Sequence, residues 1–211
     1  AFDAMGHGKT DKSVDAQTHN TMGMEAMVEL VMSMPVVDET QVGVTGHSWG
    51  NNGSAAVINA INLGTENPRI NAFLCAQGSM AVYDLQPGAM DGVTFGFSAG
   101  KDDEMDVTYF GSYTLPSSEF AISWIQEVYP EFNEDSVPLG VWFDENGAHE
   151  LQEGTKFDGV GGRVMYNPNN THPAALFSTT GVGTNINFFY GAFGTPEGAE
   201  YISSDNQIWW V

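Results

Sequence analysis

Hydrophobic and polar residues follow two patterns along the chain: short apolar runs, and longer windows with apolar residues at helical spacing. Between about residues 20 and 100 the two patterns alternate regularly. That alternation is typical of an α/β domain, in which helices cover a mostly parallel sheet. The pattern predicts strands at 42–44, 70–76, 93–99 and 163–166, and helices at 21–34, 54–63, 118–132 and 182–193.

The alternation weakens between about residues 104 and 160, where Gly, Asp and Glu become frequent. We expect an insertion or cap within the domain here, with 137–143 either a strand or part of that insertion. The aromatic residues of this segment fit two uses, lining an apolar substrate site or packing a small core of the insertion's own. They are Tyr109, Phe110, Tyr113, Trp124 and Trp142.

The chain length of 211 residues fits one domain, 1–211, with a single core. Hydrophobic residues make up 42% of the sequence, which is enough to fold. One cysteine, Cys75, excludes an internal disulfide and a cysteine-based metal cluster, and its apolar neighbours predict a buried, unreactive thiol. No run of 18 apolar residues occurs, so no transmembrane helix is predicted within these residues.

The charge balance is strongly acidic, with 27 Asp and Glu residues against 6 Lys and Arg residues and a net charge of -21. Six cations cannot supply the basic surface that nucleic acids or anionic lipids require. The acidity fits a halophilic or marine source, an extracytoplasmic location, or a calcium-binding surface. The last is disfavoured, because the sequence contains no D-x-[DN]-x-[DN]-G loop.

The clearest chemical motif is Gly46-His47-Ser48-Trp49-Gly50, between a predicted strand and a predicted helix. A tight strand-to-helix turn presents Ser48 as a nucleophile at the carboxyl end of the sheet. We expect Gly46 and Gly50 to be required because larger side chains would collide there. The backbone N–H of Trp49, at the start of the helix, is the expected oxyanion donor.

A serine nucleophile needs an acid further along the chain, on a loop that follows a later strand. The segment after the strand at 93–99 offers Asp102, Asp103 and Asp106. A Gly-x-x-Asp arrangement that starts at Gly100 favours Asp103. The other two acids are alternatives, and we expect those not used to be solvated loop residues.

The general base has two candidates downstream of the serine, His149 and His172. We favour His172, because it follows the strand-like segment RVMY and precedes the last predicted helix. His149 is then expected to be an exposed loop residue. His7 and His19 precede the serine, which is the wrong order for this triad, and His47 is expected to pack within the turn.

These residues resemble the α/β-hydrolase superfamily. Besides the motif around Ser48, residues 2–11 (FDAMGHGKTD) are similar to the Asp-x-x-Gly-His-Gly-x-Ser stretch after the fourth strand of that fold. Val37-Asp38 is similar to the family's lead-in to the serine strand. The later part of the chain is similar to a prokaryotic subgroup in which membrane-spanning helices follow the hydrolase domain. The similar segments are 169–173, 177–178, 188–189 and 205–209.

The resemblance implies an α/β-hydrolase-like fold, a mostly parallel sheet with helices on both faces. It implies a triad of Ser48, Asp103 and His172, a small-molecule acyl substrate, and neither a metal nor an organic cofactor. The family's third strand lies beside the serine strand, and the loop after it supplies a second oxyanion N–H. This chain begins at what resembles the fourth strand, so we expect the first strands to be missing. A longer polypeptide or a partner chain would supply them.

Two functional hypotheses follow. The first is a serine hydrolase that cleaves an ester or related acyl bond. The second is a catalytically inactive α/β-hydrolase-like domain that acts as a binding or assembly module of an extracytoplasmic or membrane-associated complex. The incomplete start and the Trp-containing tail at 207–211 motivate the second hypothesis. A cofactor-free haloperoxidase or lyase would use the same triad, and the sequence does not separate it from a hydrolase.

Overall fold

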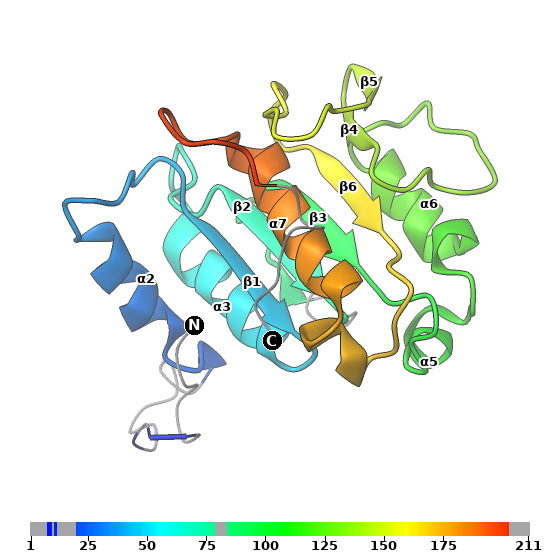
Figure 1. Ribbon diagram of the computed structural model, residues 1–211, viewed down its shortest axis with the longest axis horizontal. Coiled ribbons are helices and arrows are strands. Elements are labelled where there is room, and N and C mark those ends of the chain that lie inside the picture. The colour runs from blue at the N-terminus through cyan, green and yellow to red at the C-terminus, as the bar shows by residue number, and fades with distance from the viewer. Residues whose placement is uncertain (1–7, 10, 12–19, 79–83, 203–211) are drawn as a thin grey trace.

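The residues that the structure describes fold around one six-stranded mixed sheet with helices on both faces (Figure 1). The computed structural model describes residues 8–9, 11, 20–78 and 84–202. The strands, in their order across the sheet, are β1 (Gly43–His47), β2 (Ala72–Ala76), β3 (Thr94–Ser98), β6 (Arg163–Tyr166), β4 (Trp142–Asp144) and β5 (Gly147–His149). The first four are parallel to one another, whereas β4 is antiparallel to both β6 and β5. The predicted α/β class and mostly parallel sheet are therefore confirmed.

The helices cover the sheet from two sides. They are α2 (Met24–Met32), α3 (Gly50–Asn62), α5 (Asp106–Phe110), α6 (Glu119–Gln126) and α7 (Thr179–Phe193), with short 3-10 turns η1 (Leu115–Ser117) and η2 (Pro173–Leu176). On one face, α3 and α6 pack against a cluster that contains Phe73 and Phe95. On the other, α7 packs against Leu74 and Val164, and it crosses in front of the sheet in Figure 1.

The close approach of α7 depends on a missing side chain in the central strand β3. A Cβ atom on Gly96 would lie 2.5 Å from the ring of Phe188 and 2.8 Å from Leu74. Phe188 itself is fully buried. Because a central strand and a helix both need to bury apolar surface, the glycine lets the two layers meet without a cavity.

Several predicted element boundaries differ from the observed ones. The helix predicted from residue 54 starts at Gly50, directly after the serine turn, and the last helix starts at Thr179, where Ser178 Oγ accepts a hydrogen bond from the N–H of Gly181. The helix predicted over 118–132 ends at Gln126. Pro130 restricts the residue before it, which disfavours helix near that point.

The segment 104–160, predicted to be an insertion or cap within the domain, packs on the sheet and extends it. Its helix α6 packs on the sheet, where Trp124 lies edge-on to Phe95 with ring centroids 5.3 Å apart. Its strands β4 and β5 form a hairpin that continues the same sheet. Trp124 and Trp142 are each 2% exposed within the main cores, whereas Tyr113 is 76% exposed. The strand considered at 137–143 overlaps β4, whereas β5 was not predicted, because a strand of three residues is too short to show a clear period.

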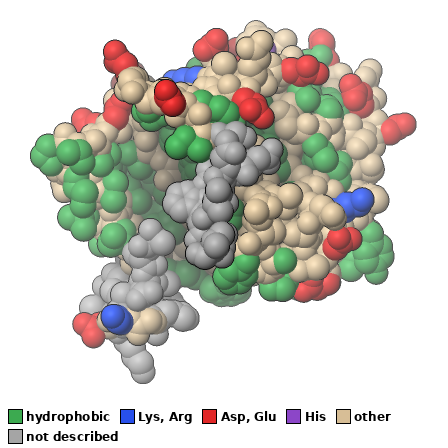
Figure 2. Space-filling model, in the orientation of Figure 1, with side chains coloured by type: hydrophobic (Ala, Val, Ile, Leu, Met, Phe, Trp, Pro, Cys, Tyr) green, Lys and Arg blue, Asp and Glu red, His purple; other side chains and the backbone are tan. Residues whose placement is uncertain are grey.

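Strand β1 forms one edge of the sheet within the part of the chain that the structure describes. The strand predicted near Phe2 and the tail at 205–209 lie outside the described residues. Among the described residues, no helix combines the length and apolar character needed to cross a membrane. Asp and Glu side chains are scattered over the face shown in Figure 2, with few Lys or Arg side chains.

Candidate active site

Ser48 lies on the tight turn between β1 and α3, in the left-handed backbone conformation with φ of 53°. Its N–H donates to the carbonyl oxygen of Ala76 at the end of the neighbouring strand. The side-chain amide of Asn51 donates to the carbonyl oxygens of both Ser48 and Ala76, at 3.1 and 2.7 Å. A left-handed conformation is costly for a residue with a side chain, so these bonds hold the serine in a conformation that it would otherwise avoid.

Only one of the two flanking glycines is sterically required, which corrects the sequence argument for Gly50. A Cβ atom on Gly46 would lie 2.5 Å from the carbonyl of Gly50, so no larger residue fits at position 46. A Cβ atom on Gly50 would meet nothing within 4 Å. Gly50 is the first residue of α3, and a side chain at this position would extend into open space.

His172 connects the serine to an aspartate. Its Nε2 lies 2.8 Å from Ser48 Oγ, and its Nδ1 lies 2.9 Å from Asp103 Oδ2 and 3.2 Å from Oδ1. A carboxylate accepts hydrogen bonds, so Nδ1 carries the proton of the neutral ring. Nε2 is then the acceptor for the Ser48 hydroxyl. The structure therefore brings together the three residues that the sequence selected, in the chain order serine, acid, histidine.

The environment distinguishes Asp103 from the two neighbouring acids. The Asp103 side chain is 2% exposed and also accepts a hydrogen bond from the N–H of Met105. Asp102 is exposed, as expected for a solvated loop residue. Asp106 was predicted to be a solvated loop residue, but it is buried on α5, and burial together with the negative charge of Asp103 raises its pKa to about 7.

A buried amide, Asn170, joins the loops that carry Asp103 and His172. Its Oδ1 accepts from the side-chain amide of Gln77, its Nδ2 donates to Ser178 Oγ, and its carbonyl accepts from the N–H of Asp102. A Cβ atom on Gly100 would lie 2.3 Å from the Asn170 carbonyl oxygen. Asn170 thus fixes the spacing of the two loops. Sequence reasoning missed it, because an Asn before a histidine gives no pattern of its own.

The remaining histidines have other positions. His149 was predicted to be an exposed loop residue, but it is a partly buried residue of β5, at the opposite edge of the sheet from β1, and its Nε2 is 2.9 Å from the buried carboxylate of Asp144. It is therefore not brought to the serine. His47 Nε2 lies 2.9 Å from the main-chain carbonyl oxygen of His172. His7 and His19 are outside the described residues.

A small hollow of about 70 Å³ opens beside the serine and is lined by Ser48, Trp49, Gln77, Tyr109 and His172, among others. Trp49 precedes α3, where backbone N–H groups have no partner within the helix. Its main-chain N–H has no hydrogen bond to any residue that the structure describes. An anion that forms beside Ser48 would therefore meet a donor and the positive end of a helix dipole.

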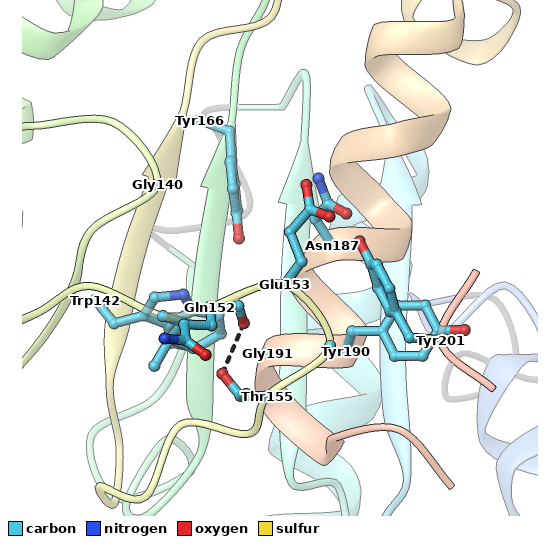
Figure 3. Close-up of a pocket in the computed structure, with 12 residues that line it drawn as sticks. Gly140, Trp142, Gln152, Glu153, Thr155, Tyr166, Asn187, Tyr190, Gly191 and Tyr201 are labelled. Atoms are coloured by element: carbon cyan, nitrogen blue, oxygen red, sulfur yellow. Dashed lines mark hydrogen bonds between the residues drawn. The ribbon is translucent and has the colours of Figure 1, made fainter. Parts of the chain in front are cut away.

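A second hollow, of about 170 Å³, lies between the β4–β6 side of the sheet and α7 (Figure 3). Trp142, Tyr166 and Tyr190 line it together with Glu153, and Thr155 donates to the carbonyl oxygen of Gln152 within it. None of the Ser48, His172 and Asp103 side chains lines it. The candidate chemistry is therefore at the serine rather than at this hollow.

The described residues were also compared with the needs of a metal site and of a reactive thiol. Within them, no group of three or more His, Cys, Asp and Glu side chains is arranged to hold a metal ion. Cys75 is buried, as predicted, and burial raises the pKa of its thiol.

A scan against protein-family models and a search of curated proteins both found no match to this chain.

Proposed function

We propose that this chain is a serine hydrolase of the α/β-hydrolase type that cleaves an ester or related acyl bond. The observation that carries the proposal is the hydrogen-bonded series Ser48, His172 and Asp103, with 2.8 and 2.9 Å between successive partners. A nucleophile within reach of a base, which a buried acid orients in turn, is the arrangement that acyl transfer uses. The serine turn between β1 and α3 and the mostly parallel sheet support the family assignment.

In the proposed reaction, Ser48 Oγ attacks the acyl carbonyl carbon while His172 Nε2 removes the hydroxyl proton. Asp103 keeps the ring in the required tautomer and stabilises the imidazolium that forms. The main-chain N–H of Trp49 donates to the oxyanion. His172 then protonates the leaving alcohol, and a water molecule hydrolyses the acyl-enzyme by the same steps.

A fluorophosphonate probe tests the proposal directly, because it reacts with an activated serine and needs no knowledge of the substrate. We expect the wild-type chain to be labelled at Ser48 and Ser48→Ala to remain unlabelled. A folded wild-type protein without Ser48-dependent labelling would argue for the inactive binding module instead. The geometry favours the hydrolase, because an inactive module does not require the three side chains to lie within hydrogen-bond distance of one another.

We also propose an extracytoplasmic or membrane-associated location. Its support is the net charge of -21 and the resemblance of the later segments to chains with membrane-spanning helices. Separation of cell fractions, followed by detection of the chain with an antibody, tests this location.

A further inference from the structure

His47, the residue before the nucleophile, contacts the general base rather than only filling the turn. Its Nε2 lies 2.9 Å from the main-chain carbonyl oxygen of His172. The centroids of the two imidazole rings are 5.0 Å apart, and the angle between the ring planes is 51°. A carbonyl oxygen only accepts hydrogen bonds, so His47 must donate through Nε2–H. The contact therefore fixes the tautomer of His47.

The contact has a mechanical consequence, because His47 and Ser48 are consecutive residues. The side chain of His172 is bonded to Ser48 Oγ, and its main chain is bonded to the residue just before that serine. A movement of the serine turn would thus carry the main chain of His172 with it. The 2.8 Å distance between the base and the nucleophile would then be preserved.

The protonation state of His47 suits this role. It is half-buried, and burial has the largest effect and lowers its pKa, although the hydrogen bond to the His172 carbonyl oxygen opposes this in part. A neutral ring can donate to the carbonyl without placing a positive charge beside the base. That charge would oppose the formation of the His172 imidazolium.

We propose that His47 is a positioning residue, whose Nε2–H bond to the His172 carbonyl holds the general base in line with Ser48. The proposal rests on the proposed hydrolase function. It goes beyond that function by giving the residue before the nucleophile a defined role. Errors of about 1 Å in the placement of a catalytic group can reduce rates by about 100-fold, so the loss of this bond should be measurable.

The test compares His47→Leu, which removes the donor, with His47→Gln, whose side-chain amide can replace it. Hydrolysis of 4-nitrophenyl acetate is measured, and His149→Gln controls for the loss of an imidazole elsewhere. We expect kcat to fall about 10- to 100-fold in H47L with KM within about twofold, and to recover to within about fivefold in H47Q. We expect H149Q to match wild type.

Three results separate the hypotheses. Retention of wild-type kcat in H47L would overturn the positioning role, and so would an H47Q variant as slow as H47L. Absence of Ser48-dependent hydrolysis in the wild type would instead overturn the proposed function. In that case, nitrogen NMR of the histidine rings still decides the contact. A proton on His47 Nε2, with a His172 signal that shifts in H47L, supports it, and a proton on Nδ1 overturns it.

Discussion

The backbone of Gly50 passes so close to Gly46 that a Cβ atom at position 46 would lie 2.5 Å from the Gly50 carbonyl oxygen, whereas the reverse contact does not exist. The two glycines of the serine turn are thus unequal. Gly46, the residue before the last one of β1, lies against the first residue of α3, and Gly50 faces open space. The steric restriction on side chains in this turn therefore falls at position 46 and not at position 50.

We therefore predict opposite outcomes for two alanine substitutions. Gly46→Ala should lower the free energy of unfolding by about 1–3 kcal/mol or more, because its Cβ has backbone on one side and no room to move. Gly50→Ala should change it by less than about 1 kcal/mol, in the stabilising direction, because alanine favours helix over glycine. Urea denaturation measures both values. Equal destabilisation by the two substitutions would contradict the asymmetry.

A second prediction separates the adjacent acids Asp103 and Asp102. Asp103→Asn should lower kcat by about 10⁴-fold, since an amide at this position favours the wrong ring tautomer of His172. Asp102→Asn is the matched control, because Asp102 is exposed and only its main chain contacts Asn170. Its kcat should stay within about twofold of wild type. Steady-state hydrolysis of 4-nitrophenyl acetate measures both, and a large loss in D102N would contradict the assignment of Asp103.

Local sequence signals were sufficient to predict the parts of the site that lie on strand ends. The turn at Ser48 could be predicted because a glycine, a short strand and a helix must coincide there. Asp103 and His172 could be predicted because the parallel strands before them end at the same edge of the sheet. The short antiparallel strand β5 could not be predicted, since a three-residue strand has no period. The limits of α6 were also not predicted correctly.

The contacts made by single side chains across the site could not be predicted from the sequence. His47 and Asn170 act through residues that lie 125 and 93 positions away, at His172 and Gln77. Such bonds depend on how loops from different strands approach one another. The burial of Asp106 could not be predicted either, because a charged residue in an acidic loop is usually solvated.

The buried thiol of Cys75 leads to a third prediction. Cys75 is the fourth residue of β2 and has no exposed surface, and its Sγ donates to the carbonyl oxygen of Gly78. Because burial raises its pKa, little thiolate forms, and the thiolate is the reactive species. Iodoacetamide at pH 8 should leave the folded protein unmodified and label it fully in guanidinium chloride. Mass spectrometry measures the modification, and rapid labelling of folded protein would contradict the burial of Cys75.

The proximity of Asp106 to Asp103 leads to a prediction on pH and stability. Burial and the Asp103 charge raise the pKa of Asp106 from 3.8 to about 7, so the folded protein holds this proton more tightly than the unfolded chain. Stability should therefore fall as pH rises from about 4 to 7, and this contribution should be constant above pH 7. The change amounts to roughly 4 kcal/mol at most, at about 1.36 kcal/mol per pKa unit.

Asp106→Asn replaces the titratable carboxyl group by a neutral amide of similar size, so this position no longer binds or releases a proton. We expect D106N and wild type to have similar stability near pH 4, and D106N to become progressively more stable than wild type up to pH 7. Thermal unfolding at intervals of half a pH unit measures the difference. Asp102→Asn again serves as control, since its exposed carboxylate should give a difference from wild type that changes little with pH. A D106N advantage that is equally large at pH 4 and pH 8 would exclude ionisation of Asp106 as its cause.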